Sequence, residues 1–246
     1  MVSHGNLNIL IDAGISLRRV RDGLRGFMLT PDDLCGVLIT HDHIDHISGV
    51  SMLLKYHKIP VFCSYGSACG IVKSCPEAEP FLNIFDPGAG FDLGGVAVKS
   101  FITPHDASDS VGFTLTAGNS KLAYVTDLGC VTDEITNAVM GCDIAVIEAN
   151  HDKDMLKRGP YPQFLKRRIL SSRGHLANCD SAALAVRLAE SGLRYLQLAH
   201  LSLENNTPEI AYSTVESALN DAGFNVGKNV ELDVAPHDTI GRVYDV

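Results

Sequence analysis

Six consecutive positions hold three histidines and two aspartates, in the stretch His41-Asp42-His43-Ile44-Asp45-His46. Imidazole and carboxylate groups are ligands that zinc, manganese and iron accept in proteins. His41 and His43 lie two residues apart and could converge on one ion, whereas the adjacent Asp45 and His46 could face a second ion. The density of ligands favours a metal site over the plainer alternative, a solvated polar loop.

Two expected elements hold this stretch at its ends. The apolar run at 35–39 is typical of a buried strand, and the apolar residues at 47, 50, 53 and 54 suit an amphipathic helix. The histidines and aspartates should therefore lie on a loop between a strand and a helix.

Other polar residues with possible chemistry follow apolar, strand-like runs further along the chain. They are Asp12, His105, Asp127, Glu148 and His200. Taken singly, His105 could be a loop residue, Asp127 a turn former and His200 the end of a strand, because lone residues of these types are usually structural. Their order along the chain, taken together with the motif at 41–46, favours a shared site.

In that order the motifs resemble the signature of the metallo-β-lactamase-fold hydrolases. The blocks 148–152 and 174–178 resemble, within that family, the WalJ/YycJ-like exonucleases of bacteria. The resemblance covers nearly the whole chain. It implies an α+β fold, a four-layer αββα metallo-β-lactamase-like sandwich, formed by residues 1–246 as a single domain.

The resemblance also implies a dinuclear metal site with two divalent ions, zinc or manganese, with iron as a further possibility. The ligand set that it implies is His41, His43 and His105 on the first ion, Asp45, His46 and His200 on the second, and Asp127 between them. Asp12 would orient a metal-bound imidazole.

Three residues receive roles in catalysis. Asp45 would orient or deprotonate the attacking water, and Glu148 would orient a neighbouring imidazole. His175 would donate a hydrogen bond to a phosphate oxygen or protonate the leaving alcohol, although it could also simply begin a helix. His151 would lie near the site with no assigned role.

The order of elements favours two sheets sandwiched between helices. A run of strand-like segments between 81 and 125 precedes the return of helices, which excludes a simple alternating parallel-sheet fold. The first expected strand covers 7–11. The resembled subgroup begins with one more strand, so either the start codon is misassigned or that strand is missing here, which would expose a sheet edge.

Composition limits the class of protein. The 246 residues contain no apolar run long enough to cross a bilayer and no amino-terminal signal segment, so we expect a cytoplasmic protein without membrane contact. Seven cysteines without a Cys-x-x-Cys pair argue against a disulfide framework and against a thiolate zinc site. The sequence points to no protein partner.

The formal net charge of −9 speaks against nucleic-acid binding, but the charge is unevenly distributed. Segment 153–173 holds seven basic residues and one acidic residue. This segment could guide a phosphodiester backbone or could simply be a solvated helix face.

The sequence therefore predicts a metal-dependent phosphodiesterase, an exonuclease whose substrate is DNA. Two alternatives stay open. The same site could hydrolyse thioesters or lactones, because one fold hosts many reactions, or the chain could be a metal-binding regulatory module without catalysis.

Overall fold

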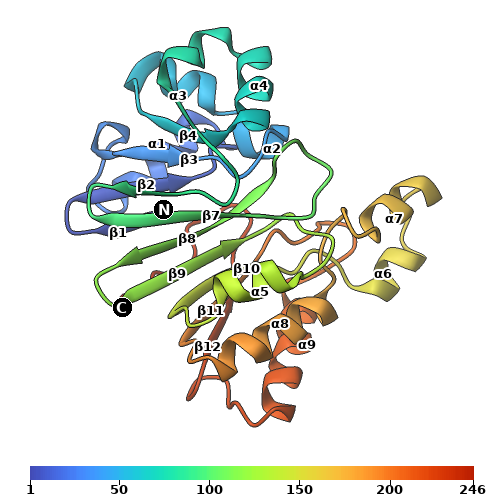
Figure 1. Cartoon of the computed structure of the whole chain (residues 1–246). Coiled ribbons are helices and arrows are strands. Elements are labelled where there is room, and N and C mark those ends of the chain that lie inside the picture. Colours follow the sequence, from blue (N-terminus) through green and yellow to red (C-terminus); the bar gives the residue numbers. More distant parts are fainter. The chain divides into compact units, whose positions relative to one another are not determined.

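The computed structural model describes residues 1–246, whose contacts divide the chain into two compact units. Unit 1 comprises Met1–Ile102 and Ala107–Val111, and unit 2 comprises Thr103–Asp106 and Gly112–Val246. Each unit combines helices with β-sheet, in agreement with the expected α+β class (Figure 1).

Unit 1 contains a five-stranded sheet in the order β1-β2-β3-β4-β5, in which β2 to β5 pair in parallel. The strands of this sheet are β1 (Val2–His4), β2 (Leu7–Ile11), β3 (Gly36–Leu38), β4 (Val61–Ser64) and β5 (Leu82–Phe85). Unit 1 also contains the antiparallel pair β6 (Gly90–Leu93) and β7 (Val96–Ile102), which is not part of the five-stranded sheet. Its helices are α1 (Leu17–Arg25), α2 (Ile44–Ile47), α3 (Val50–His57) and α4 (Tyr65–Ser74), with 3-10 turns at Pro31–Asp33 and Pro76–Phe81.

The apolar spacing of the helices explains how unit 1 builds its core. Leu17, Val20 and Leu24 recur every three or four residues on α1 and are all buried. They belong to one cluster that also includes Val37 of β3 and Leu53 of α3. The core thus fixes the sheet and helices between which the histidine motif is held.

Unit 2 continues with strands in the order β12-β11-β10-β9-β8, and β9 to β12 pair in parallel. The strands are β8 (Val111–Ala117, within unit 2 from Gly112), β9 (Ser120–Val125), β10 (Ile144–Glu148), β11 (Tyr195–Ala199) and β12 (Glu231–Val234). The helices are α5 (Asp133–Val139), α6 (Lys153–Arg158), α7 (Gln163–Ile169), α8 (Asn178–Glu190) and α9 (Pro208–Asp221). Helices α8 and α9 pack against each other (Figure 1).

Strand β10 is the centre of the sheet of unit 2. Its apolar run at 144–147 is almost entirely buried, as is typical of a parallel strand covered on both faces. No helix of the protein combines the length and the apolar character needed to cross a membrane.

The carboxyl ends of neighbouring parallel strands meet at one edge of a sheet, and the polar residues of interest follow such ends. In unit 1, Asp12 follows β2 and Thr40 lies two residues beyond β3. In unit 2, Asp127 lies two residues beyond β9, Glu148 ends β10 and His200 follows β11. Parallel pairing therefore gathers each group within its own unit.

Three of these residues have a left-handed backbone. The φ angles are 58° at Asp12, 59° at Asp127 and 58° at His200, a region in which residues other than glycine are uncommon.

A short strand precedes Leu7. Strand β1 pairs antiparallel with β2, with Val2 opposite Ile9 and His4 opposite Leu7. The two-residue connection contains Gly5, whose φ of 57° suits a tight hairpin. Residues before Leu7 thus cover part of the sheet edge that a missing first strand would leave open.

The expected loop and helix over residues 41–57 differ from the structure. Asp45 and His46 lie in the helical turn α2, and the chain is interrupted before α3. The Gly49 N–H donates to the Ala13 carbonyl at 2.8 Å instead of continuing the helix. A Cβ at Gly49 would lie 2.0 Å from the Ile15 carbonyl oxygen, so the close approach of two backbones separates the helices.

Candidate metal centre

In unit 1, the motif is supported by a hydrogen-bonded group around Asp12 and Thr40. The Thr40 N–H and hydroxyl donate to the Asp12 carboxylate at 2.8 Å and 3.0 Å. His46 Nδ1 lies 2.8 Å from the other Asp12 oxygen, and His41 Nδ1 lies 3.1 Å from the Thr40 hydroxyl. All four side chains are buried or nearly so.

This group determines which nitrogen of each imidazole faces outward. The Asp12 carboxylate can only accept, so His46 Nδ1 carries the proton and its Nε2 keeps a lone pair. The Thr40 hydroxyl donates its proton to Asp12 and accepts a hydrogen bond from His41 Nδ1. His41 Nδ1 therefore carries a proton, and His41 Nε2 keeps a lone pair, as in His46. Metal-bound histidines typically have this arrangement.

The remaining motif residues lie beside these two imidazoles. The Asp45 carboxylate approaches His46 Nε2 at 3.6 Å and is itself mostly exposed. The His43 ring meets the His41 ring edge-on, with centroids 4.6 Å apart. Unit 1 therefore brings together His41, His43, Asp45 and His46 with Asp12.

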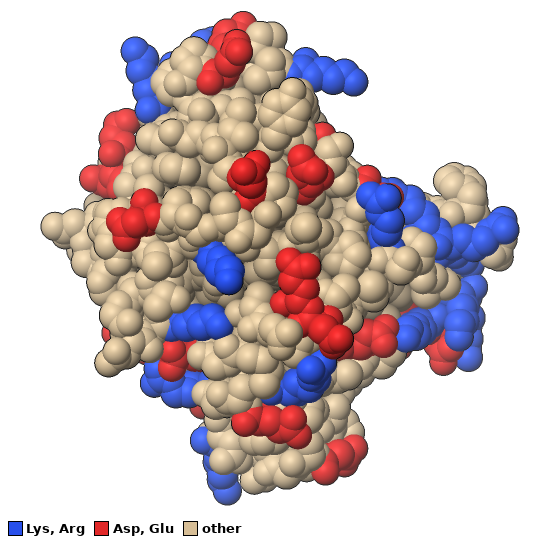
Figure 2. Space-filling view, viewed as in Figure 1, with Lys and Arg blue, Asp and Glu red and all other residues tan.

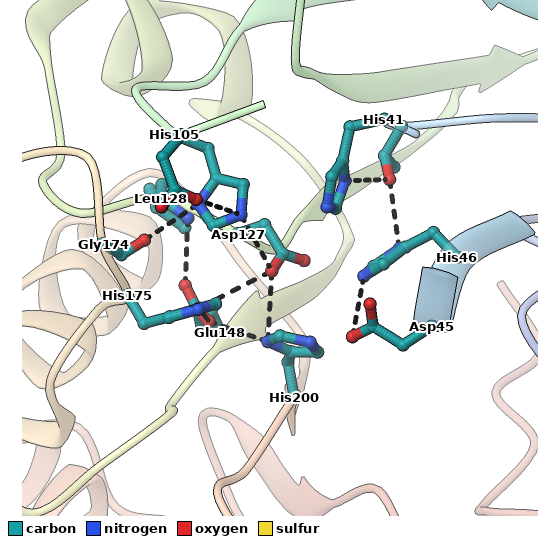
Figure 3. A network of polar contacts seen from close by, with 12 residues as sticks. His41, Asp45, His46, His105, Asp127, Leu128, Glu148, Gly174, His175 and His200 are labelled. Carbon is teal, nitrogen blue, oxygen red and sulfur yellow. Dashed lines mark hydrogen bonds and ion pairs between the residues drawn. The ribbon is translucent and has the colours of Figure 1, made fainter. Parts of the chain in front are cut away.

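In unit 2, the fully buried carboxylate of Glu148 holds two histidines. His175 Nδ1 and His200 Nδ1 each donate to Oε1 at 2.8 Å (Figure 3). The backbone N–H groups of Leu128 and Leu176 donate to Oε2 at 3.0 Å and 3.1 Å. Burial opposes the charge of Glu148, but the hydrogen bonds from His175 and His200 outweigh burial and keep the pKa of the carboxyl below its usual range.

His105 has a similar support made of backbone. Its Nδ1 donates to the Gly174 carbonyl at 2.9 Å, and Arg173 Nε donates to the His105 carbonyl at 3.0 Å. Burial lowers the pKa of His105, which favours the neutral imidazole that binds metals. Its Nε2 lies 3.8 Å from Asp127 Oδ1.

Asp127 lies among three imidazoles of unit 2. Its Oδ1 is 3.8 Å from His105 Nε2, 3.6 Å from His175 Nδ1 and 3.4 Å from His200 Nδ1. Ligand atoms of Asp127, Glu148, His175 and His200 all lie within 4.8 Å of one another. Unit 2 therefore brings Asp127, Glu148, His175 and His200 together, with His105 beside Asp127.

The donor set fits a divalent metal ion. Four of the predicted ligand histidines, two in each unit, anchor Nδ1 on an oxygen and leave Nε2 for coordination. Asp45 and Asp127 add carboxylate oxygens, and none of the candidate ligand groups contains a cysteine. Such nitrogen and oxygen donors suit zinc, manganese and iron alike.

Sequence reasoning named Asp12 and Glu148 as groups that orient imidazoles, but it missed two further groups of this kind. Thr40 and the backbone carbonyl of Gly174 received no role, although both orient a predicted ligand. The position of Thr40 between a strand and the first histidine was the only available signal for it. His151 is buried with both ring nitrogens lacking hydrogen bonds, and burial lowers its pKa to about 4.

Comparison with known proteins agrees with these observations. A family model described as a beta-lactamase superfamily domain matches residues 7–200. The chain is 35% identical over 234 residues to exodeoxyribonuclease YycJ of Bacillus anthracis, a match that covers 94% of this chain and 86% of the relative. It is 32% identical over 237 residues to exodeoxyribonuclease WalJ of Streptococcus pneumoniae, with 93% and 86% covered.

Solved structures agree on the fold. The metallo-β-lactamase-fold protein YhfI of Bacillus subtilis superposes with a TM-score of 0.72 at 17% identity, over 97% of this chain and 88% of that one. This fold implies a divalent metal ion, which the donor set can accept. The chain therefore belongs to the metallo-β-lactamase superfamily of metal-dependent hydrolases, in the group that contains the exodeoxyribonucleases YycJ and WalJ.

Proposed function

We propose that the chain is an exonuclease that hydrolyses phosphodiester bonds of DNA with the help of two divalent metal ions, zinc or manganese. The observation that supports this best is the anchoring of four histidines, two in each unit, through Nδ1, which puts the lone pair of each ring on Nε2 as in metal-bound histidines. Relatives that match over most of the chain are named exodeoxyribonucleases. The free state of all seven cysteines suits a place in the reducing cytoplasm.

The proposed ligand set combines residues from both units. His41, His43 and His105 would hold one ion, and Asp45, His46 and His200 the other, with Asp127 shared between them. Bound ions of this kind supply Lewis acidity and a water of lowered pKa.

The chain's own residues would orient the reacting groups. Asp45 is the most exposed carboxylate of the motif, so it can accept a proton from the attacking water while facing the site. Glu148 holds His175 through Nδ1, so the other nitrogen of His175 is available to donate to a phosphate oxygen or to the leaving alcohol. Burial opposes protonation of His175, but its hydrogen bond to Glu148 prevails and raises its pKa.

The basic segment 153–173 supports a polyanionic substrate. Figure 2 shows Lys and Arg side chains gathered over the part of the molecule where Figure 1 labels α6 and α7. The protein as a whole has a formal charge of −9, so this local concentration of cations is the part of unit 2 best suited to phosphates.

The direct test is hydrolysis of a labelled DNA oligonucleotide and of bis(p-nitrophenyl) phosphate with added manganese or zinc. We expect turnover that stops when a chelator is added and returns with the metal. Thioester and lactone substrates assayed beside them should be hydrolysed more slowly. The absence of phosphodiester turnover above a metal-free blank with either ion would refute the proposed function.

Replacing Asp12 by asparagine should weaken metal binding by about ten- to a hundredfold, because an amide nitrogen cannot accept the His46 Nδ1 proton. Asparagine tolerates the left-handed backbone of this position, so the fold should be kept. Isothermal titration of the metal would measure the change. The matched control is Asp32→Asn, which alters the surface pair of Asp32 and His57, also at 2.8 Å, and should leave metal affinity unchanged.

A further inference from the structure

Helices α6 and α7 form a small projection that we call the arm, residues 153–169. The arm is inserted between Glu148 and His175, which hydrogen-bond to each other, and it stands away from the sheet of unit 2 (Figure 1). The buried amine of Lys166 on α7 donates to the Lys157 carbonyl on α6 at 2.7 Å. This bond ties the two short helices together, so the arm presents a defined surface.

The surface of the arm exposes one large aromatic ring. Phe164 is 71% exposed in the first turn of α7, although burying such a side chain would be worth roughly 2 kcal/mol. Nothing in its helix requires an aromatic residue, since Lys166 and Ile169 supply the buried face of α7. The ring is therefore available to a partner.

Two cations of the arm have no carboxylate partner. Arg167 lies three residues after Phe164, on the same side of α7, and only contacts the Gln163 carbonyl through Nε. Arg158 ends α6 and is exposed without an ion pair. Lys157, in contrast, lies 3.8 Å from Asp154. The arm thus combines an exposed aromatic face with two unneutralised guanidinium groups.

The base of the arm is attached to the candidate metal centre. Arg168 forms an ion pair with Asp106, the neighbour of His105, and Arg173 donates to the His105 carbonyl. The His175 N–H donates to the Ile169 carbonyl at 3.0 Å. A strand held on the arm would therefore lie within unit 2 next to His105 and His175.

We propose that the arm is a binding site for single-stranded DNA, in which Phe164 stacks on a nucleobase while Arg158 and Arg167 contact the flanking phosphates. This inference rests on the proposed function, because it assigns the DNA strand a path to the same site. Aromatic side chains stack on unpaired bases of any sequence, and cations follow the backbone. In a duplex the base faces are covered by their neighbours, so the same ring has little to stack on.

The test measures binding separately from catalysis. A fluorescein-labelled thymidine oligonucleotide with phosphorothioate linkages, which resist cleavage, is titrated with the purified, metal-containing protein and followed by anisotropy. We expect Phe164→Ala to weaken binding about tenfold or more and Phe164→Tyr to retain most of it. The double variant Arg158→Gln, Arg167→Gln should reduce the salt dependence of binding, with a slope about 1.4 units shallower for two phosphate contacts.

Tyr56 provides a matched control. It is 56% exposed on α3 of unit 1, with Arg21 and Lys55 within 5.9 Å and 5.7 Å of its ring centroid. Tyr56→Ala should bind the oligonucleotide like the wild type, since it removes an exposed ring beside cations outside the arm.

Three results would overturn the assignment. Wild-type affinity in Phe164→Ala would exclude stacking, and an equal loss of affinity for a blunt duplex would exclude selectivity for single strands. If Phe164→Ala bound DNA like the wild type but no longer self-associated, the ring would belong to a protein–protein interface instead. Because the titration requires no turnover, a failed hydrolysis assay would reject the proposed function without deciding this inference.

Discussion

Replacing Asp127 by asparagine should strip metal from the protein and reduce phosphodiesterase activity by about a thousandfold. Asp127 is buried among His105, His175 and His200, where its negative charge would offset the charge of the proposed metal ions. A Lewis-acidic ion contributes several kcal/mol to the transition state, and each 1.36 kcal/mol is about tenfold in rate. Elemental analysis of the purified variant beside the rate would measure both effects.

The control for this variant is Asp143→Asn. Asp143 also lies in unit 2, where it accepts from the Lys121 N–H at 2.9 Å and pairs with Arg194 at 3.1 Å, at the opposite end of β10 from Glu148. The same chemical change there should leave metal content and rate intact. An Asp127→Asn protein with full metal content and wild-type rate would contradict the assignment of Asp127 as a ligand.

Replacing Glu148 by alanine should lower the free energy of unfolding by about 3–5 kcal/mol, because it removes a buried charge that accepts four hydrogen bonds. Two imidazoles and two backbone N–H groups would then lack their acceptor. The variant should also lose activity, since His200 and His175 are no longer oriented. Urea denaturation followed by circular dichroism would give the change in unfolding free energy.

The variant Glu148→Gln distinguishes the effect of orienting His175 and His200 from the effect of the negative charge of Glu148. Glutamine has nearly the same shape and keeps one acceptor oxygen, so its loss of stability should be smaller, whereas metal affinity should still fall about ten- to a hundredfold. A Glu148→Ala protein within 1 kcal/mol of the wild type would show that the four hydrogen bonds contribute little to the fold.

The sequence predicted strands best where burial imposes a continuous apolar pattern. The strand expected at 7–11 coincides with β2. The apolar run at 143–148 also predicts a buried strand, and β10 begins one residue later. The sequence predicts a helix from about 65 to 74, which is α4, and the Ser64 side chain caps its first turn. Within the strand-like run between 81 and 125, Gly90 predicts a turn, whereas the structure has the four-residue strand β6 there.

Features that depend on the close approach of distant backbone segments could not be predicted from the local sequence pattern. The break between α2 and α3 depends on contact of Gly14 and Gly49 with segments distant in the sequence, and no periodicity records it. The types of the ligands were readable at 41–46, but the acceptors that orient them, such as Thr40 and Gly174, become visible only in the fold. The joining of the two ligand groups in one centre, and a single domain over 1–246, stay predictions.

The left-handed backbone at Asp12, Asp127 and His200 narrows the changes open to this chain in evolution. Aspartate, asparagine and histidine enter that region more readily than other side chains, which lose roughly 1–2 kcal/mol there. Cysteine or glutamate at these positions would therefore destabilise the fold before it altered any chemistry. Substitution between aspartate and histidine exchanges oxygen for nitrogen donors and keeps this backbone, so it changes preference only among hard and borderline metal ions. Sulfur ligands, which soft metal ions prefer, would be harder to acquire at these positions.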